Sequence, residues 1–122
     1  MAMTCLIVDD SRVLRTVARK IFEELEFAVA EAEDGLGALR AVREKMPDVI
    51  LFDGNLASMK GVDFLKSVRG QQGGERPVIL LSTTESDVEE IAPALHAGTN
   101  EYIMKPFDRG IIEAKLAEVG LV

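Results

Sequence analysis

The chain has 122 residues, 48% of them hydrophobic and 29% charged, which is the size and composition of one domain with a core of its own. Its 14 Lys and Arg against 21 Asp and Glu give a net charge of −7, which opposes attraction to phosphate backbones and disfavours direct binding of nucleic acid. No apolar run approaches the roughly 20 residues that cross a bilayer, and the first residues lack the pattern of a signal peptide, so we expect a single cytoplasmic domain over residues 1–122, without membrane insertion or an output domain.

Short apolar segments alternate along the chain with longer amphipathic segments, and this alternation is typical of an α/β fold. The expected strands are residues 5–8, 27–30, 49–52, 78–81 and 102–104. Continuously apolar strands of this kind are typical of a parallel sheet that helices cover on both faces.

Apolar residues at helical spacing follow each expected strand. They fall within residues 14–25, 36–42, 62–68, 88–95 and 111–119. Ser11 precedes the first of these segments and is placed to cap it; Gly98 is placed to end the fourth in a left-handed conformation. Pro93 lies inside the fourth segment and removes a backbone hydrogen bond. That helix therefore either kinks or begins its regular part near Pro93 after an irregular first turn.

Polar residues follow four of the expected strands, at the points where the strands end. They are Asp9 and Asp10, Asp53, Ser82, and Lys105. Five strand–helix pairs predict an open parallel sheet, and the carboxyl ends of its strands meet at the edge where such sheets bind ligands. Three carboxylates gathered there would repel one another unless a cation shares the site. Lys105 and a divalent metal are the two candidates, and oxygen-only ligands suit Mg²⁺ or a similar hard cation.

Each of these residues also has a purely structural interpretation. Asp9 and Asp10 could cap the first helix, where carboxylates are favourable. Asp53 could be a turn residue, Ser82 could cap the next helix, and Lys105 could be a solvated loop residue. The common position of the acids and the lysine at one sheet edge favours the functional interpretation.

The segments that carry these residues resemble the receiver domain of two-component response regulators, in particular the stand-alone chemotaxis-type receivers. The matching segments are residues 6–10, residues 33–35, Asp53 with Gly61 eight residues later, residues 77–82 and residues 102–107. They are spread over essentially the whole chain. The resemblance implies a flavodoxin-like (βα)5 fold whose doubly wound parallel sheet has the strand order 2-1-3-4-5.

The resemblance also implies the chemistry of the acidic residues. Asp53 matches the aspartate that accepts a phosphoryl group from a phosphohistidine. Asp9, Asp10, Asp53 and the backbone carbonyl of Asn55 match the ligands of a Mg²⁺ ion. Lys105 matches the lysine that, together with the metal, neutralises the phosphoryl oxygens during an in-line transfer.

Ser82 and Tyr102 match the residues that respond to phosphorylation. Ser82 corresponds to the hydroxyl residue that hydrogen-bonds the phosphoryl group, and Tyr102 to the aromatic residue whose rotamer reports that movement; Tyr102 could also be only a half-buried residue of an edge strand. The implied protein is a switch rather than a turnover enzyme. A histidine kinase or a histidine phosphotransfer protein donates the phosphoryl group, and the surface around the fourth helix, fifth strand and fifth helix then binds a downstream protein target.

The chain departs from the usual pattern of this family near Asp53. Residues 56–57 read Leu-Ala where Met-Pro is usual, and Gly54 adds backbone freedom, so the carbonyl of Asn55 is expected to be less preorganised. Thr83 stands where alanine is common, and its extra bulk could narrow access to Asp53. These departures support the alternative of a pseudo-receiver that works as a protein interaction module without phosphorylation.

Two enzyme or cofactor-binding alternatives fit the residues less well. Phosphatases with an aspartyl nucleophile resemble Asp-x-Asp at that position, whereas residues 53–55 read Asp-Gly-Asn. A flavin-binding domain of the same topology would have a hydroxyl- and glycine-rich loop after its first strand, where this chain has Asp9 and Asp10.

Overall fold

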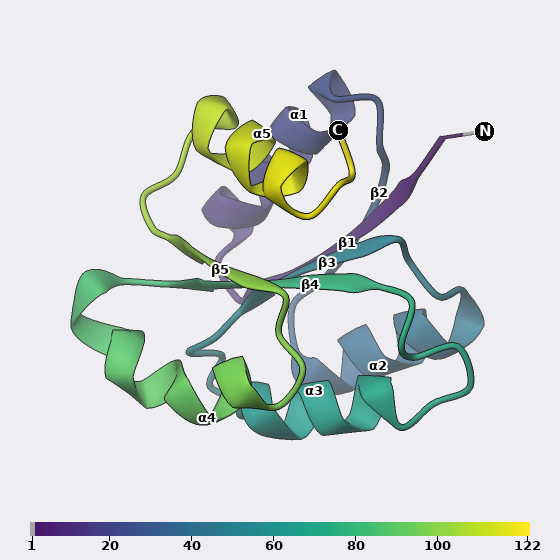
Figure 1. The fold of residues 1–122 in the computed structure, drawn as a ribbon, viewed down its shortest axis with the longest axis vertical. Helices are drawn as coiled ribbons and strands as arrows, with labels where there is room; N and C mark the ends of the chain where they lie inside the picture. The colour runs from purple at the N-terminus through teal and green to yellow at the C-terminus, as the bar shows by residue number, and fades with distance from the viewer. Residues whose placement is uncertain (1) are drawn as a thin grey trace.

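The computed structural model describes residues 2–122, and a five-stranded parallel sheet forms its centre (Figure 1). The strands are β1 (Thr4–Val8), β2 (Ala28–Ala32), β3 (Val49–Asp53), β4 (Val78–Thr83) and β5 (Glu101–Met104). They are hydrogen-bonded in the order β2-β1-β3-β4-β5, and every pairing is parallel. The expected flavodoxin-like (βα)5 fold and its strand order are confirmed.

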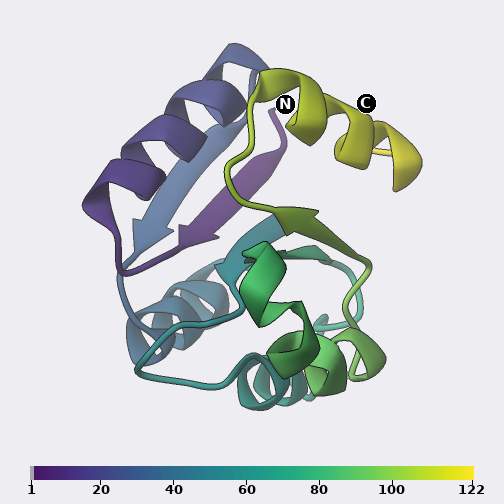
Figure 2. The same cartoon turned by 90° about the vertical axis from the view of Figure 1, so that its left-hand side faces the viewer.

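Helices cover both faces of the sheet, as the apolar strands predict. The helices are α1 (Arg12–Glu24), α2 (Gly35–Glu44), α3 (Gly61–Arg69), the 3₁₀ segment η1 (Glu85–Ile91), α4 (Ala92–His96) and α5 (Arg109–Glu118). Figures 1 and 2 show α1 and α5 on one face and α2, α3 and α4 on the other. None of the helices within residues 2–122 has the length and apolar character needed to cross a bilayer.

The sheet separates two apolar clusters, one under each helical layer. Phe52 of β3 and Phe64 of α3 stack with ring centroids 4.0 Å apart in one cluster, and Phe22 and Phe27 meet edge to face at 5.3 Å in the other. All five residues of β3 are buried. Burial on both faces explains why the central strands are continuously apolar in sequence. The polar residues at their carboxyl ends lie at the edge of the sheet.

The fourth helical segment resolves the two possibilities raised by Pro93. A 3₁₀ segment, η1, runs to Ile91, and the regular helix α4 begins at Ala92 with Pro93 in its first turn. Proline is tolerated there because the first backbone N–H groups of a helix have no partner inside the helix. Gly98, which follows α4, adopts a φ of 115°, a conformation that favours glycine.

Helix α1 begins as the sequence indicates. The side chain of Ser11 accepts a hydrogen bond from the backbone N–H of Leu14 at 3.2 Å. Ser11 thus satisfies one of the free donors at the start of the helix. This leaves the two preceding aspartates available for the edge of the sheet.

Candidate functional site

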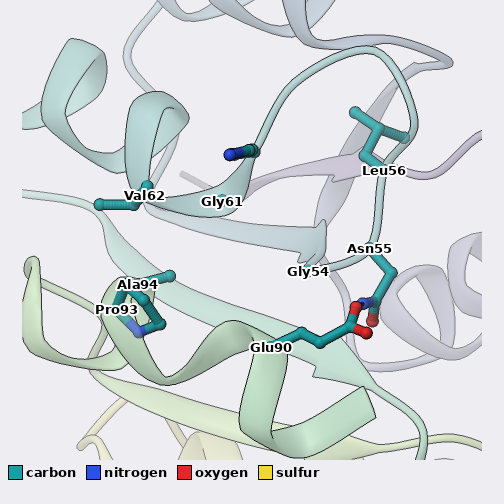
Figure 3. Close-up of a pocket in the computed structure, with 9 residues that line it drawn as sticks. Gly54, Asn55, Leu56, Gly61, Val62, Glu90, Pro93 and Ala94 are labelled. Atoms are coloured by element: carbon teal, nitrogen blue, oxygen red, sulfur yellow. Dashed lines mark hydrogen bonds between the residues drawn. The ribbon is translucent and has the colours of Figure 1, made fainter.

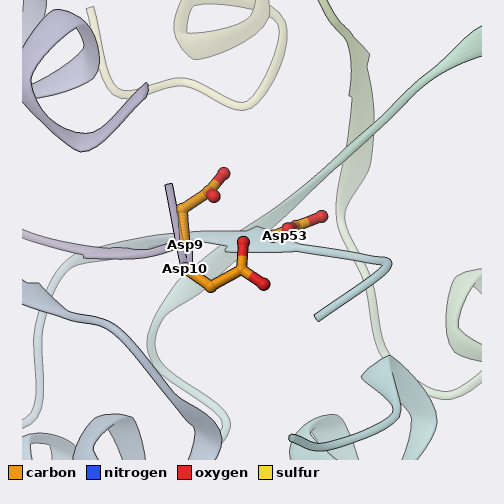
Figure 4. A group of neighbouring side chains, drawn as sticks. All are labelled: Asp9, Asp10 and Asp53. Carbon is orange, nitrogen blue, oxygen red and sulfur yellow. The ribbon is translucent and has the colours of Figure 1, made fainter. Parts of the chain in front are cut away.

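Three carboxylates meet at the carboxyl edge of the sheet. Asp9 and Asp10 follow β1 and Asp53 ends β3, and one oxygen from each lies within 4.8 Å of the others (Figure 4). Asp9 and Asp53 are buried, with 5% and 6% of their surface exposed, whereas Asp10 is exposed. The structure therefore brings together the acidic residues that the strand ends predict.

Lys105 enters this cluster from the loop after β5. Its Nζ lies 3.1 Å from Asp9 Oδ2 and 3.3 Å from Asp53 Oδ1. Its backbone N–H donates to the carbonyl of Thr83 at 2.7 Å, which fixes the start of the loop beside β4. The alternative of a solvated loop lysine is wrong, because only 14% of the Lys105 side chain is exposed.

Asp9 is held at every polar group of its backbone and side chain. Its N–H donates to the carbonyl of Ala32 at 3.2 Å, its carbonyl accepts from Arg15 Nη1 at 2.7 Å, and its Oδ1 accepts from the N–H of Ser11 at 2.9 Å. Arg15 also pairs with Glu31 of β2 at 3.0 Å. These contacts fix the direction in which Asp9 presents its carboxylate.

Arg15 was not predicted to belong to the site. In the sequence it is one of several basic residues on the polar side of the first helix, and only the folded chain brings Glu31 within its reach. Glu31 also contacts Arg19 at 2.7 Å. Hydrogen bonds from Arg19 and Arg15 lower the pKa of Glu31, so this carboxylate stays charged and keeps the arginine in place.

Asp53 ends β3 directly opposite Ser82 of β4. Its Oδ1 accepts from the N–H of Asn55 at 3.0 Å and also contacts Lys105. Burial raises the pKa of Asp53 above its ordinary value of 3.8, and the charge of Asp9 acts in the same direction, whereas the Asn55 N–H and the lysine oppose the rise. The hydrogen bond from Asn55 and the ammonium of Lys105 therefore offset only part of the free-energy cost of burying the charged Asp53 carboxylate.

Ser82 is buried beside Asp53 and belongs to β4. Its hydroxyl donates a long hydrogen bond of 3.4 Å to the carbonyl of Phe52. The alternative that Ser82 caps the following helix is wrong, because β4 continues through Thr83 and η1 begins only at Glu85. A long bond to a backbone carbonyl leaves this hydroxyl free to take a stronger acceptor.

Asn55 lies in the loop between β3 and α3, with its backbone next to Asp53. Its side-chain Oδ1 accepts from Thr83 Oγ1 at 3.2 Å, and its Nδ2 donates to Glu90 Oε2 at 3.4 Å. Thr83 is almost fully buried. The sequence suggested only that Thr83 adds bulk beside Asp53, because a contact between β4 and this loop depends on the folded arrangement. The role of the Asn55 carbonyl as a ligand stays a prediction.

Tyr102 lies on β5, away from the acidic cluster. It is exposed to 38%, and Lys115 Nζ of α5 lies 5.6 Å from the centroid of its ring, within the range of a cation–π contact. Lys115 also contacts Glu101 at 3.5 Å. This outward position fits an exposed aromatic of the edge strand, and the switch role of Tyr102 stays a prediction.

The donor set of the cluster fits a hard divalent cation. Asp9, Asp10 and Asp53 supply only oxygen atoms, and one ammonium against three carboxylates leaves two negative charges uncompensated. Such oxygen-rich, partly solvent-accessible sites suit Mg²⁺, which keeps some of its waters and needs only a few protein ligands.

Comparison with known proteins agrees with this geometry. The family model of the response regulator receiver domain matches residues 5–117. Chemotaxis protein CheY-3 of Vibrio cholerae is 35% identical over 118 residues, 96% of this chain and 91% of that protein. Chemotaxis protein CheY of Pseudomonas aeruginosa is 32% identical and covered to 95%, again over 96% of this chain.

Solved structures of receivers share the whole fold. The structure of CheY4 of Vibrio cholerae matches with a TM-score of 0.89 and 30% identity, over 98% of this chain and 99% of that one. The receiver domain of the sensor histidine kinase PA1611 from Pseudomonas aeruginosa matches with a TM-score of 0.87 and 29% identity over 97% of both chains, and it has a magnesium ion coordinated in its active-site cleft. This chain therefore belongs to the response regulator receiver family of two-component signalling, among its CheY-like members.

Proposed function

We propose that the protein is a cytoplasmic, phosphorylation-dependent switch in which Asp53 accepts a phosphoryl group from the phosphohistidine of a histidine kinase or a histidine phosphotransfer protein. The observation that carries this proposal is the position of Asp53, buried at the sheet edge among two further carboxylates and 3.3 Å from the Lys105 ammonium. Burying a single charged carboxylate would cost free energy, and two more carboxylates beside it add repulsion. Lys105 offsets part of this negative charge, and a bound cation would offset the rest.

The contacts of Asp53 indicate which of its oxygens reacts. Oδ1 receives both the Asn55 N–H and the Lys105 ammonium, so we assign Oδ2 as the nucleophile. Oδ2 attacks phosphorus as the P–N bond of the donor breaks; a P–O bond forms, and the electron pair of the broken bond stays on the imidazole nitrogen. Lys105 places a positive charge beside the oxygens of the arriving phosphoryl group.

Asp9, Asp10 and Asp53 would hold Mg²⁺, together with the backbone carbonyl of Asn55. When bound, the ion supplies positive charge that neutralises the transferring phosphoryl group. The oxygen-only donor set supports this assignment. The magnesium ion in the cleft of the related PA1611 receiver supports it too.

The output of the switch begins at Ser82. We infer that its hydroxyl leaves the long bond to the Phe52 carbonyl and donates to a phosphoryl oxygen, a stronger acceptor because it is charged. This movement would pull the end of β4 and let Tyr102 change its exposed position. The surface around α4, β5 and α5 would then bind a downstream protein target, so the protein would alter its own state rather than turn over a substrate.

The test is to supply a small phosphoryl donor and measure the intact mass. The protein is incubated with Mg²⁺ and either acetyl phosphate or phosphoramidate, whose P–N bond imitates phosphohistidine. We expect one added phosphoryl group on the parent protein and none on Asp53→Asn or in the presence of EDTA. If neither donor modifies the parent, the switch is wrong and the pseudo-receiver interpretation takes its place.

A further inference from the structure

The loop that follows Asp53 packs unusually closely against η1 and α4. A methyl group added at Gly54 would lie 2.7 Å from Ile91 Cγ2, and one added at Gly61 would lie 3.3 Å from Ala94 Cβ. Glycine at these positions therefore lets η1 approach the backbone of the loop and lets α4 approach the first residue of α3. Beside this contact lies a cavity of about 420 Å³ bordered by both segments (Figure 3).

A chain of side-chain hydrogen bonds crosses the same junction. Thr83 Oγ1 at the end of β4 donates to Asn55 Oδ1 at 3.2 Å, and Asn55 Nδ2 donates to Glu90 Oε2 on η1 at 3.4 Å. Figure 3 shows the side chains of Asn55 and Glu90 pointing toward one another. We call Thr83, Asn55 and Glu90 the amide relay.

The chemistry of the three groups fixes the direction of the relay. A carboxylate can only accept, so the amide must turn its nitrogen toward Glu90. Its oxygen then faces the Thr83 hydroxyl, which can donate. Thr83 Oγ1 has a second acceptor, the Thr84 carbonyl, at the longer distance of 3.4 Å. The contact to Asn55 is the shorter and is anchored by a side chain that is 1% exposed.

The other restraints on the loop lie on either side of Asn55. Residues 54–60 contain no proline, and the fixed backbone angle that proline imposes is a common way to preorganise a turn. Leu56 anchors the loop in the core, and its N–H donates to the Asp53 carbonyl at 3.2 Å. The Gly54 N–H donates to the Ser82 carbonyl at 2.8 Å, and Ser58 Oγ accepts from the Gly35 N–H at 3.1 Å. Asn55 thus lies between anchored residues, and its own side chain is what connects it to β4 and η1.

We propose that Thr83 and Glu90 are positioning residues, which hold the metal-binding loop through the two ends of the Asn55 amide and tie η1 to it. The positioning of a metal ligand rests on the proposed function, since that function assigns the Asn55 carbonyl to Mg²⁺. The tie between β4, the loop and η1 does not depend on it. The bond between Thr83 and Asn55 is shorter and partly buried, whereas the bond between Asn55 and Glu90 is longer and exposed, so we expect the Thr83 hydroxyl to have the larger effect.

The first experiment measures amide hydrogen exchange of residues 54–56 by NMR without added metal. Thr83→Val keeps the shape of the side chain and removes its hydroxyl. We expect exchange to speed up about three- to tenfold, the equivalent of one hydrogen bond, whereas Thr83→Ser, which keeps the hydroxyl, exchanges like the parent. Glu90→Ala has a smaller effect in the same direction, and Glu90→Gln, which keeps an acceptor, has almost none.

The second experiment measures Mg²⁺ affinity by calorimetry on the same variants. Thr83→Val is expected to weaken Mg²⁺ binding about three- to tenfold, and Thr83→Ser to restore it. Glu89→Ala is the matched control for Glu90→Ala, since it removes an exposed acid from the neighbouring position of η1. In the double variant Thr83→Val/Glu90→Ala, the increase in exchange should be smaller than the sum of the increases in the two single variants, because both substitutions act through the Asn55 amide.

The outcomes separate the relay from the proposed function. Unchanged exchange in Thr83→Val, or strictly additive effects in the double variant, would overturn the relay. If the parent binds Mg²⁺ but takes no phosphoryl group, the proposed switch fails and the affinity data still decide the relay. If the parent binds no Mg²⁺, the metal-binding loop loses its assignment, and the exchange data alone decide whether Thr83 and Glu90 hold it.

Discussion

The ammonium of Lys105 lies 3.1 Å from the carboxylate of Asp9, so the lysine pairs with a residue assigned to the metal as well as with the proposed phosphoryl acceptor. Its distance to Asp53 Oδ1 is almost the same, 3.3 Å. A charge shared between two buried carboxylates offsets part of their repulsion. It also repels a second cation that binds to the same oxygens, and this competition can be measured.

We expect Lys105→Ala to bind Mg²⁺ about tenfold more tightly than the parent, since it removes a positive charge that contacts two of the carboxylates that would hold the ion. Phosphorylation by acetyl phosphate should become much slower, because the charge beside the phosphoryl oxygens is lost. Calorimetry and the rate of mass increase check the two parts. Loss of Mg²⁺ binding in this variant would mean that the lysine organises the metal ligands, contrary to the roles assigned here.

Asp53→Asn is expected to stabilise the protein at neutral pH in the presence of EDTA. Burial, followed by Asp9, raises the pKa of Asp53, so the folded state holds the proton more tightly than the unfolded state and the charged carboxylate opposes folding. This cost is present above the raised pKa and disappears as the pH falls toward 3.8, where the unfolded state also takes up the proton. Thermal unfolding from pH 7 to pH 4 should show a Tm advantage of a few degrees that shrinks with acidification.

Asp10→Asn serves as the control for that experiment. Asp10 lies in the same cluster but is exposed, so its substitution removes repulsion without removing a buried charge. A smaller change of Tm is expected. An Asp53→Asn variant that is less stable than the parent at pH 7 would contradict the assigned effect of burial.

Arg15→Ala is expected to lower the free energy of unfolding by about 1–3 kcal/mol, because the Asp9 carbonyl and Glu31 both lose a charged donor. Mg²⁺ affinity should fall as well, since Asp9 is less firmly oriented. Arg15→Lys should not rescue either property, as one ammonium cannot imitate the two-pronged guanidinium. Urea unfolding and calorimetry measure both effects, and Arg12→Ala on the exposed side of α1 controls for the loss of charge.

One rule predicts part of the site from the sequence: polar residues at the carboxyl ends of apolar parallel strands meet at one sheet edge. Asp53, Ser82 and Lys105 could be located in this way because their positions depend only on strand order and direction. Arg15 could not, since its partners are supplied by β2 and by the turn before α1. From the sequence, Thr83 was considered only for its size. The hydrogen bond from its hydroxyl to Asn55 could not be predicted, because hydrophobic periodicity does not give the conformation of the loop that holds Asn55.

The fold was similarly predictable except where local rules conflict. The helical spacing at residues 88–95 and the presence of Pro93 allow two solutions, and propensity alone does not choose between them. The structure places a 3₁₀ turn before Ala92, with Ile91 packed on Gly54. The contact between Ile91 and Gly54, which are far apart in the sequence, thus accompanies the choice of a 3₁₀ turn before Ala92, which the sequence alone did not decide.

Arg69→Ala tests a second arginine that joins separate segments. Its guanidinium donates to the carbonyls of Gly74, Pro77 and Gly98 and to Asn100 Oδ1, at distances of 2.7–3.2 Å. Removing it leaves several acceptors without a charged donor, so we expect a loss of about 2–4 kcal/mol in the free energy of unfolding. Urea denaturation measures this loss, and Lys66→Ala, at an exposed position of the same helix, is the control. If Arg69→Ala is as stable as Lys66→Ala, water replaces the hydrogen bonds of the guanidinium and the expectation is wrong.

Gly54→Ala isolates the close contact between the loop and η1. Gly54 does not adopt a positive φ, so alanine meets no backbone strain, and any cost arises from the new methyl group 2.7 Å from Ile91 Cγ2 and 3.2 Å from the Ser82 carbonyl. Overpacking of this kind should destabilise the protein by about 1–3 kcal/mol. In Gly110→Ala on α5 the new methyl would meet only Asp108 Oδ1, at 3.5 Å, so that variant should gain about 0.5–1 kcal/mol. Opposite shifts of the two urea midpoints confirm the steric contact, whereas a Gly54→Ala variant at least as stable as the parent rules it out.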